Sequence, residues 1–239
     1  MAGEILRVED LHTHIAGFHI LQGVNFKVSA NTVTAILGRN GVGKTTTLKT
    51  IMGIYRPSKG RVIFQDEDIT GLPTHIITRK GISFVPSERN VFASLTVEEN
   101  LKLAYTGSRE KFKEKLELVY SFFPELRTFS TLMAGELSGG QQRMLALACG
   151  MIREHSLLIL DEPSEGLSPM YVKNFFRKLK NFIGKNGRTV LLIEQNFAYA
   201  KEIVDYLYLM DKGTVVAGFP ASEIGQRKEI IQKILGVKI

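Results

Sequence analysis

The sequence predicts an α/β fold whose mainly parallel sheet is covered by helices. Three runs, 32–37, 157–162 and 189–194, are almost wholly apolar, which is typical of strands buried on both faces of a parallel sheet. Helical patterns lie between such runs, and this alternation indicates an α/β domain. The 239 residues, 44% hydrophobic and 23% charged, are enough for one large domain or for a core with a subdomain.

Further strands are expected at 4–11, 60–64, 81–86 and 206–211, and the parts near the first 30 residues and 60–70 look like a smaller antiparallel element. From 96 to 153 the pattern is helical throughout. We therefore expect a single domain over 1–239, with a core formed by 1–95 and 154–239 and an inserted α-helical subdomain at about 96–153.

Two helix starts are marked by their capping residues. Thr96 is followed three residues later by Glu99, which is the pattern of a capping box. Ser168 precedes Pro169, and proline is favoured at the first helical position. The stretch 221–235 is expected to be a terminal amphipathic helix.

Charge and composition limit the possible settings. The formal net charge of +7 suits an anionic partner such as a nucleotide, although lysines and arginines that only solvate helix faces would give the same balance. No apolar run follows the N-terminus and no stretch approaches the roughly 18 apolar residues of a membrane span. Cys149 is the one cysteine, so a disulfide framework is excluded and a cytoplasmic protein is expected.

The stretch GRNGVGKTT, residues 38–46, follows one apolar strand and opens a helix. It matches the phosphate-binding loop of P-loop NTPases, in which glycines let backbone N–H groups approach phosphates. The lysine can reach the β- and γ-phosphates and the following hydroxyl can hold Mg²⁺. A glycine turn that only packs a helix is the alternative, and the lysine and threonine disfavour it. The expected ATP-binding residues are Gly38, Arg39, Asn40, Gly41, Val42, Gly43, Lys44, Thr45 and Thr46.

An acidic pair ends the strand at 157–162. Asp161 can face a metal ion from the strand end, and Glu162 can also reach the crevice because strand alternation breaks there. A second carboxylate beside the first suits the orientation of an attacking water. A solvated strand end is the alternative interpretation of such a pair.

A second glycine turn, LSGGQ, begins at 137, with Ser138 as the expected N-cap of a helix. Together with the phosphate loop it resembles the ABC ATPase family over nearly the whole chain. The resemblance implies that ATP lies between two head-to-tail subunits. Residues Ser138, Gly139, Gly140 and Gln141 would then contact the ATP of the partner subunit.

Four positions depart from the family pattern, one of them Ser168, which stands where an aspartate is common. Ser87, with Glu88 beside it, stands where a glutamine usually contacts Mg²⁺, and Gln195 stands where a histidine is usual. Ile15 stands where an aromatic residue stacks on adenine, with His14 and Phe18 nearby. The resemblance assigns catalytic roles to Glu162 and Gln195. The metal would be held by Thr45, Asp161 and Ser87.

The stretches VPSERNVFASLTVEENL, LDEPSEGLSP and LLIEQN are similar to ATPase subunits of branched-chain amino-acid importers. This similarity implies ATP-driven transport at the cytoplasmic face of the cell membrane. The implied partners are two membrane-spanning permease subunits, a second ATPase subunit or a second copy, and an extracytoplasmic substrate-binding protein. No nucleic acid is expected.

Two other functions and two other candidate sites are compatible with parts of the sequence. A soluble ABC ATPase acting on ribosome or nucleic acid usually has two fused halves or a coiled-coil insertion, for which 239 residues leave no room. A P-loop kinase gives no reason for LSGGQ. His12 and His14 could share a strand face, but two ligands make a poor metal site. Val91, Phe92 and Leu95, beside Glu88 and Arg89, form either a partner patch or a joint between subdomains.

Overall fold

The computed structural model describes residues 3–88, 91–186 and 188–236, and it has an α/β architecture with two sheets. The central sheet has six strands in the order β10-β9-β3-β8-β7-β6. All neighbouring pairs are parallel except β9 with β10. The prediction of a mainly parallel sheet is thereby confirmed. The strands are β3 (Val33–Leu37), β6 (Ile82–Val85), β7 (Leu157–Asp161), β8 (Thr189–Glu194), β9 (Tyr206–Asp211) and β10 (Thr214–Pro220).

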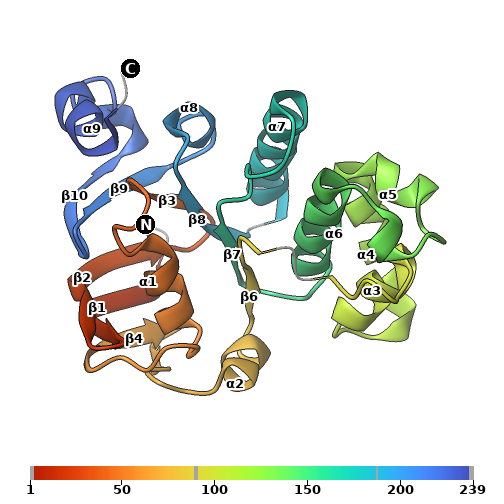
Figure 1. The fold of residues 1–239 in the computed structure, drawn as a ribbon, viewed down its shortest axis with the longest axis horizontal. Coiled ribbons are helices and arrows are strands. Elements are labelled where there is room, and N and C mark those ends of the chain that lie inside the picture. Colours follow the sequence, from red (N-terminus) through yellow and green to blue (C-terminus); the bar gives the residue numbers. More distant parts are fainter. Residues whose placement is uncertain (1–2, 89–90, 187, 237–239) are drawn as a thin grey trace.

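A four-stranded antiparallel sheet lies beside the N-terminus, at the lower left of Figure 1. Its strands are β1 (Glu4–Ile15), β2 (Phe18–Ser29), β4 (Lys59–Phe64) and β5 (Glu67–Asp68), in the order β2-β1-β4-β5. A smaller antiparallel element was predicted here, without bounds for β2 and β5, and β10 of the central sheet was not predicted. Strand β2 alternates buried and exposed positions along most of its length, as expected for a strand with one solvated face.

Helices cover the central sheet, and several more gather at the right of Figure 1. The covering helices are α1 (Lys44–Ile51), α2 (Thr74–Arg79), α7 (Pro169–Asn186), α8 (Phe197–Ala200) and α9 (Lys228–Leu235). The gathered group is α3 (Val97–Ala104), α4 (Arg109–Phe122), α5 (Pro124–Thr128) and α6 (Gly139–Met151). Short 3₁₀ turns span Ala134–Glu136 and Ala221–Glu223. Within the described ranges, no helix combines the length and apolar character that crossing a bilayer requires.

The predicted capping box at Thr96 forms, and the predicted N-cap Ser138 is part of a second one. Thr96 accepts a hydrogen bond from the backbone N–H of Glu99, whose carboxylate in turn accepts from the N–H of Thr96. Ser138 and Gln141 are paired in the same reciprocal way at the start of α6. Each box satisfies backbone donors that a helix start leaves without partners.

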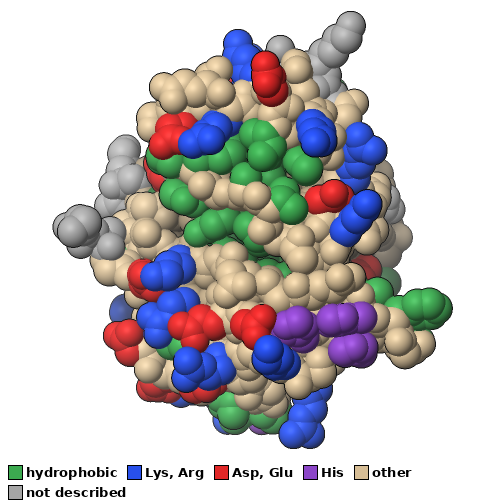
Figure 2. All heavy atoms as spheres, turned by 90° about the vertical axis from the view of Figure 1, so that its left-hand side faces the viewer, with side chains coloured by type: hydrophobic (Ala, Val, Ile, Leu, Met, Phe, Trp, Pro, Cys, Tyr) green, Lys and Arg blue, Asp and Glu red, His purple; other side chains and the backbone are tan. Residues whose placement is uncertain are grey.

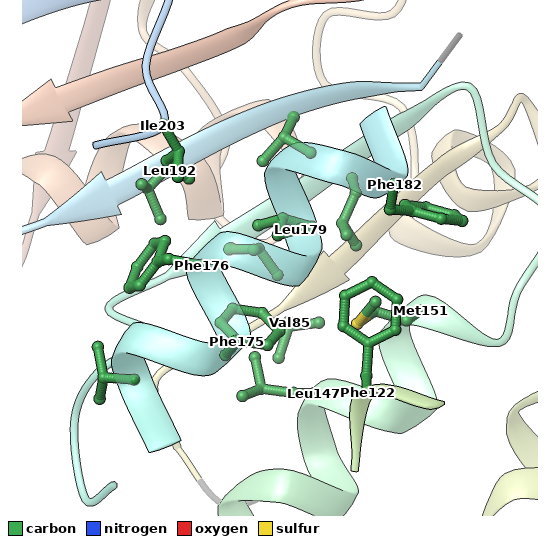
Figure 3. Close-up of a cluster of buried hydrophobic side chains, with 14 of the residues drawn as sticks. Val85, Phe122, Leu147, Met151, Phe175, Phe176, Leu179, Phe182, Leu192 and Ile203 are labelled. Atoms are coloured by element: carbon green, nitrogen blue, oxygen red, sulfur yellow. The ribbon is translucent and has the colours of Figure 1, made fainter. Parts of the chain in front are cut away.

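The all-apolar strands are explained by two cores on opposite faces of the central sheet. Ile36 and Leu191 belong to the core shared with α1 and the antiparallel sheet. Leu37 and Leu192, one position further along each strand, belong to the core shared with α6 and α7, because successive strand side chains point to opposite faces. Figure 3 shows α7 directing Phe175, Leu179 and Phe182 into this second core.

Candidate functional site

The loop 38–43 joins β3 to α1 along a path that requires glycine at particular points. A Cβ on Gly38 would lie 2.4 Å from the carbonyl oxygen of Met210, far inside contact distance. Gly43 is the N-cap of α1 with φ of 108°, and no side chain caps the first-turn N–H groups. A helix start with free N–H groups attracts anions.

A hollow of about 530 Å³ opens in front of this loop. It brings together the phosphate-loop segment, the end of β7, the end of β8 and the β1–β2 hairpin. The residues that line it are Ile15, Ala16, Phe18, Ile20, Asn40, Gly41, Gly43, Lys44, Thr45, Thr46, Glu162, Glu165 and Gln195. Six of the nine predicted phosphate-loop residues therefore meet Glu162, Gln195 and Ile15 in one hollow.

Lys44 lies at the base of the hollow with its side chain only 4% exposed. Its ammonium donates hydrogen bonds to the carbonyl oxygens of Gly38 at 2.9 Å and Arg39 at 3.0 Å. The same Nζ lies 3.5 Å from Oε1 of Glu162. A buried cation with these partners is positioned to meet a phosphate that enters the hollow.

Asp161 is fully buried. Its Oδ1 accepts a 3.2 Å hydrogen bond from the hydroxyl of Thr45, while Oδ2 has no partner among the described residues. Burial raises the pKa of Asp161 to about 6, the Thr45 hydrogen bond opposes that shift, and the charges of Glu162 and Glu88 add to it. A buried carboxylate oxygen without a partner, beside a hydroxyl, fits a hard cation.

Glu162 leaves the strand in a left-handed conformation, with φ of 48°. This conformation is uncommon for residues other than glycine, and the backbone N–H of Glu162 donates at 2.9 Å to the carbonyl of Ile193. Its Oε2 accepts a hydrogen bond of 2.8 Å from Nε2 of Gln195. The expected break in strand alternation therefore places Asp161 and Glu162 on the same side, both near the phosphate loop.

Arg143 of α6 is a part of this region that the sequence analysis did not find. It is 1% exposed. Its guanidinium donates to four backbone carbonyls, those of Pro86 at 2.6 Å, Ser87 at 3.2 Å, Asp161 at 2.8 Å and Glu162 at 2.9 Å. Burial lowers the pKa of Arg143, and the charge of Asp161 opposes that change. The sequence feature that could have identified Arg143 is its place as a single cation directly before an apolar helical run.

Glu194, at the end of β8, was also not found. Its side chain is 1% exposed. Oε1 accepts from the N–H of Ser164 at 3.1 Å, and Oε2 accepts from the N–H groups of Gln195 at 2.8 Å and Asn196 at 3.1 Å. This carboxylate therefore ties the segment after Glu162 to the segment that carries Gln195.

Several predicted residues lie apart from the hollow. The guanidinium of Arg39 lies beside Gly236, whose added Cβ would come within 2.6 Å of Nη2. Val42 packs against the core below the loop. Ser87 contributes its carbonyl to Arg143, and its side chain is not among the lining groups.

The residues of the second glycine turn, Ser138, Gly139, Gly140 and Gln141, do not line the hollow of their own chain. A Cβ on Gly140 would lie 3.2 Å from the carbonyl of Gly166, so the turn packs close to the segment between Glu162 and α7. Ser138 is exposed. These residues are available to a second molecule.

The β1–β2 hairpin presents both an aliphatic and an aromatic side chain to the hollow. Ile15 is partly buried, whereas Phe18 is 72% exposed. An exposed ring at the edge of a polar hollow can stack on a planar base. Phe18 is therefore a better stacking surface than Ile15, the position assigned from the resemblance.

Three histidines of this hairpin form a group at the lower right of Figure 2. His19 stacks on His14 with ring centroids 4.2 Å apart and on His12 at 5.1 Å. The sequence analysis counted only His12 and His14. In the part of the chain that the structure describes, no group of three or more histidine, cysteine or acidic residues could hold a metal ion.

Comparison with known proteins places the chain among related sequences. A family model described as ABC transporter matches residues 21–165. A protein of Archaeoglobus fulgidus named probable branched-chain amino acid transport ATP-binding protein LivF is 39% identical, covering 98% of this chain and 99% of that relative. The high-affinity branched-chain amino acid transport ATP-binding protein BraG of Pseudomonas aeruginosa is 33% identical, with 89% and 91% covered.

Solved structures agree with this placement. The ADP conformation of MJ1267, an ATP-binding cassette of an ABC transporter, has a TM-score of 0.82 at 27% identity, covering 98% of this chain and 97% of that chain. A nucleotide-free ATP-binding cassette from an ABC transporter has a TM-score of 0.81 at 27% identity, covering 98% and 96%. The backbone similarity extends over nearly the full length of each chain.

Proposed function

This chain belongs to the ABC transporter family, and we propose that it powers the import of branched-chain amino acids. It is an ATP-binding subunit that hydrolyses ATP. The substrate class is inferred from relatives that are named as branched-chain amino acid transport proteins. Those relatives match nearly full length, which favours a transporter over a soluble ATPase that acts on ribosome or nucleic acid.

The observation that carries the proposal is the arrangement of charge around the hollow. Lys44 lies at its base, Glu162 and Gln195 form a hydrogen-bonded pair at its side, and Phe18 lies at its edge. A nucleoside triphosphate has a planar base and an anionic tail. We place the base against Phe18 and Ile15 and the phosphates against the N-terminus of α1.

Mg²⁺ fits the donors at Thr45 and Asp161, because Asp161 has an oxygen without a partner and Thr45 supplies a hydroxyl. When bound there, the ion would neutralise charge on the phosphates. Ser87, the third predicted ligand, contacts Arg143 through its carbonyl, and its side chain does not line the hollow.

Glu162 is proposed to accept the proton of the attacking water. Its carboxylate lies near the base of the hollow, and Gln195 donates to one of its oxygens. That hydrogen bond fixes the carboxylate direction without adding a positive charge. On ATP binding the ammonium of Lys44, now 3.5 Å from Oε1 of Glu162, would turn toward phosphate and leave that oxygen free to accept.

The working unit is proposed to be a pair of ATPase chains. Ser138, Gly139, Gly140 and Gln141 lie away from the hollow of their own chain, so they can complete the hollow of a second chain. A helix start with an exposed capping serine can donate to a terminal phosphate. The second chain is either a copy or a homologous subunit.

A groove of about 550 Å³ is proposed to receive a segment of a membrane-spanning permease subunit. Phe84, Val85 and Ala146 contribute apolar lining, and Lys49 and Glu88 form an ion pair of 2.8 Å at its border. Lys49 lowers the pKa of Glu88 by a hydrogen bond. Because the charge of Glu88 acts on Asp161, an occupant of the groove would act on the metal-side carboxylate.

Phe92 is a second proposed contact with the permease. Its side chain is 60% exposed, whereas Val91 and Leu95 are partly buried. The exposed ring favours a partner patch at Phe92 and packing at its neighbours, and Arg89 lies outside the described residues. With permeases as partners, the chain would act at the cytoplasmic face of the membrane, supplied by an extracytoplasmic substrate-binding protein.

The deciding experiment is reconstitution with the two permeases and the second ATPase chain in liposomes. Labelled leucine should accumulate only when ATP, Mg²⁺ and a leucine-binding protein are present. Labelled aspartate serves as the control substrate. Hydrolysis without transport of any branched-chain amino acid would reject the substrate assignment, and absence of hydrolysis would reject the motor role.

A further inference from the structure

A crevice of about 270 Å³ lies between α7 and α8, away from the ATP hollow. Phe176 on α7 and Ile203, just beyond α8, are each 2% exposed and form its apolar wall. The ring of Tyr199 is nearly parallel to that of Phe176, with centroids 6.1 Å apart and an interplanar angle of 15°. Figure 3 shows Phe176, Leu192 and Ile203 gathered on one side of α7.

Three cations border this apolar wall. Lys173, Arg177 and Lys180 occur at spacings of four and three on α7, which places them on one face of the helix. Among the described residues, no carboxylate lies within ion-pair distance of these three cations, and this includes Glu202 at the same border.

The polar contacts at the border are weak competitors for a charged ligand. Lys180 donates to the backbone carbonyl of Glu202 at 2.9 Å, and Arg177 donates to the side-chain oxygen of Asn174 at 3.2 Å. Both acceptors are neutral. A carboxylate would be the stronger acceptor for either cation, because charge-assisted hydrogen bonds are about twice as strong.

The volume restricts the ligand. Sites for drug-sized molecules are about 300–1,000 Å³, so a crevice of about 270 Å³ suits a smaller molecule. Apolar walls with cations at the border suit a molecule with a short branched or aromatic body and one carboxylate. The carboxylate of Glu202 could in addition accept from an ammonium group.

The walls of the crevice continue from the two segments that meet in the ATP hollow. Helix α7 follows the segment that begins at Glu162, and α8 begins directly after Gln195 and Asn196. The side chain of Asn196 accepts at 3.0 Å from the N–H of Ala198 and so fixes the start of α8. The Glu162–Gln195 hydrogen bond joins the segments that lead into α7 and α8.

We propose that the α7–α8 crevice is a regulatory site for a small apolar carboxylate. The ligand carboxylate takes the ammonium of Lys180 from the carbonyl of Glu202 and so breaks the hydrogen bond that joins α7 to the turn two residues beyond α8. Helix α8 then shifts, Gln195 moves from Glu162, and hydrolysis slows. The slowing of hydrolysis rests on the proposed function, whereas binding of the ligand does not.

Binding is tested on the full chain by calorimetry with 4-methylpentanoate, leucine and the neutral control 4-methylpentanamide. Both acids should bind with dissociation constants of about 1 mM or below, and the amide should not. Tighter binding of leucine than of 4-methylpentanoate would assign the ammonium to Glu202 and identify amino acids as the source. Equal binding of the amide, or no binding of either acid, would overturn the proposal.

The site is located with one pair of matched variants. Lys180→Met keeps the aliphatic stem and removes the cation, so affinity for both acids should fall at least about tenfold. Lys201→Met removes an exposed cation outside the crevice and should leave the affinity unchanged. Equal loss in both variants, or in neither, would place the carboxylate elsewhere.

Coupling has a readout that does not need ATPase activity. Hydrogen exchange of the 195–200 segment should speed up when 4-methylpentanoate saturates the wild-type chain, and it should not change in Lys180→Met. In the assembled transporter the same acid should slow hydrolysis several-fold. Binding without a change in exchange would reject the regulatory role and keep the site, whereas loss of all hydrolysis without ligand would count against the proposed function instead.

Discussion

The side-chain amide of Gln195 donates a hydrogen bond of 2.8 Å to the carboxylate of Glu162, across the ends of β8 and β7. The two residues are 33 positions apart and belong to neighbouring parallel strands. Gln195 therefore contacts the carboxylate itself, and it is positioned to orient Glu162.

Glu162→Gln should retain ATP binding and lose about 100-fold or more in hydrolysis, because the amide preserves size but cannot accept the proton. The variant should hold the two ATPase chains together in the presence of ATP. The rate of hydrolysis and the ATP-dependent association of the two ATPase chains are measured in the assembled transporter. Lys44→Ala is the contrasting variant, since it should lose nucleotide binding itself. Wild-type turnover in Glu162→Gln would remove the assignment.

Gln195→Ala should slow single-turnover hydrolysis by about 5- to 150-fold, which corresponds to about 1–3 kcal/mol for an acceptor left without its donor. Between pH 6 and 8 the wild type should show no activity step that arises from Gln195. Gln195→His should introduce such a step, since an imidazole titrates near pH 6.5. A rate for Gln195→Ala equal to that of wild type would show that Gln195 is not needed.

Ser138→Arg should leave ATP affinity of the single chain nearly unchanged and reduce hydrolysis, because Ser138 lies outside the hollow of its own chain. In a mixed dimer with Lys44→Ala, one site carries both defects and the other carries none. Partial activity should therefore return on mixing. Mixed dimers, verified by differential tags, that recover no activity would argue against contact with the partner's ATP.

Phe92→Ser should weaken association with the permease and leave the isolated chain folded, because the ring is 60% exposed and exposed substitutions change stability little, by about 0.5 kcal/mol or less. Val216→Ser is the matched control, since Val216 is 45% exposed on β10, at the opposite side of Figure 1. Co-purification and thermal melting measure the two effects. Unfolding of Phe92→Ser would favour a packing role.

Asp161→Asn should stabilise the nucleotide-free chain above pH 6 and abolish hydrolysis. Burial raises the pKa of Asp161 from 3.8 to about 6, so in the wild type stability falls as pH rises from about 4 to 6 and stays lower above that window. The full effect corresponds to at most about 3 kcal/mol. Asn has no proton to lose, so the variant lacks this fall.

The stabilisation is measured as the unfolding free energy of both chains from pH 4 to 8. Asp211→Asn, at the end of β9, is the control for removing a strand-end carboxylate. A stability difference between Asp161→Asn and wild type that does not vary with pH would contradict the assigned cause.

The sequence by itself determined the phosphate loop, the acidic pair, the capping box at Thr96, the N-cap at Ser138 and the apolar strands of the central sheet. Each of these depends on residues close together in the chain, because glycines, a helix start and an apolar strand act within a few positions. The contacts that join these segments, such as the hydrogen bond from Thr45 to Asp161, come from the fold. The alternation of strands and helices was similarly sufficient for the fold class.

Only the tertiary structure showed the contacts of Arg143 and Glu194 and the exposure of Phe18. Arg143 donates hydrogen bonds to carbonyls at two strand ends, one of them 57 positions away in the chain. Glu194 accepts a hydrogen bond from Ser164, in the segment after Glu162 and 30 positions away. A buried charge reveals its purpose only through its partners, because burial without them is unfavourable. The hairpin brings both Ile15 and Phe18 to the hollow, and a strand pattern of period two does not fix at a turn how exposed each side chain is.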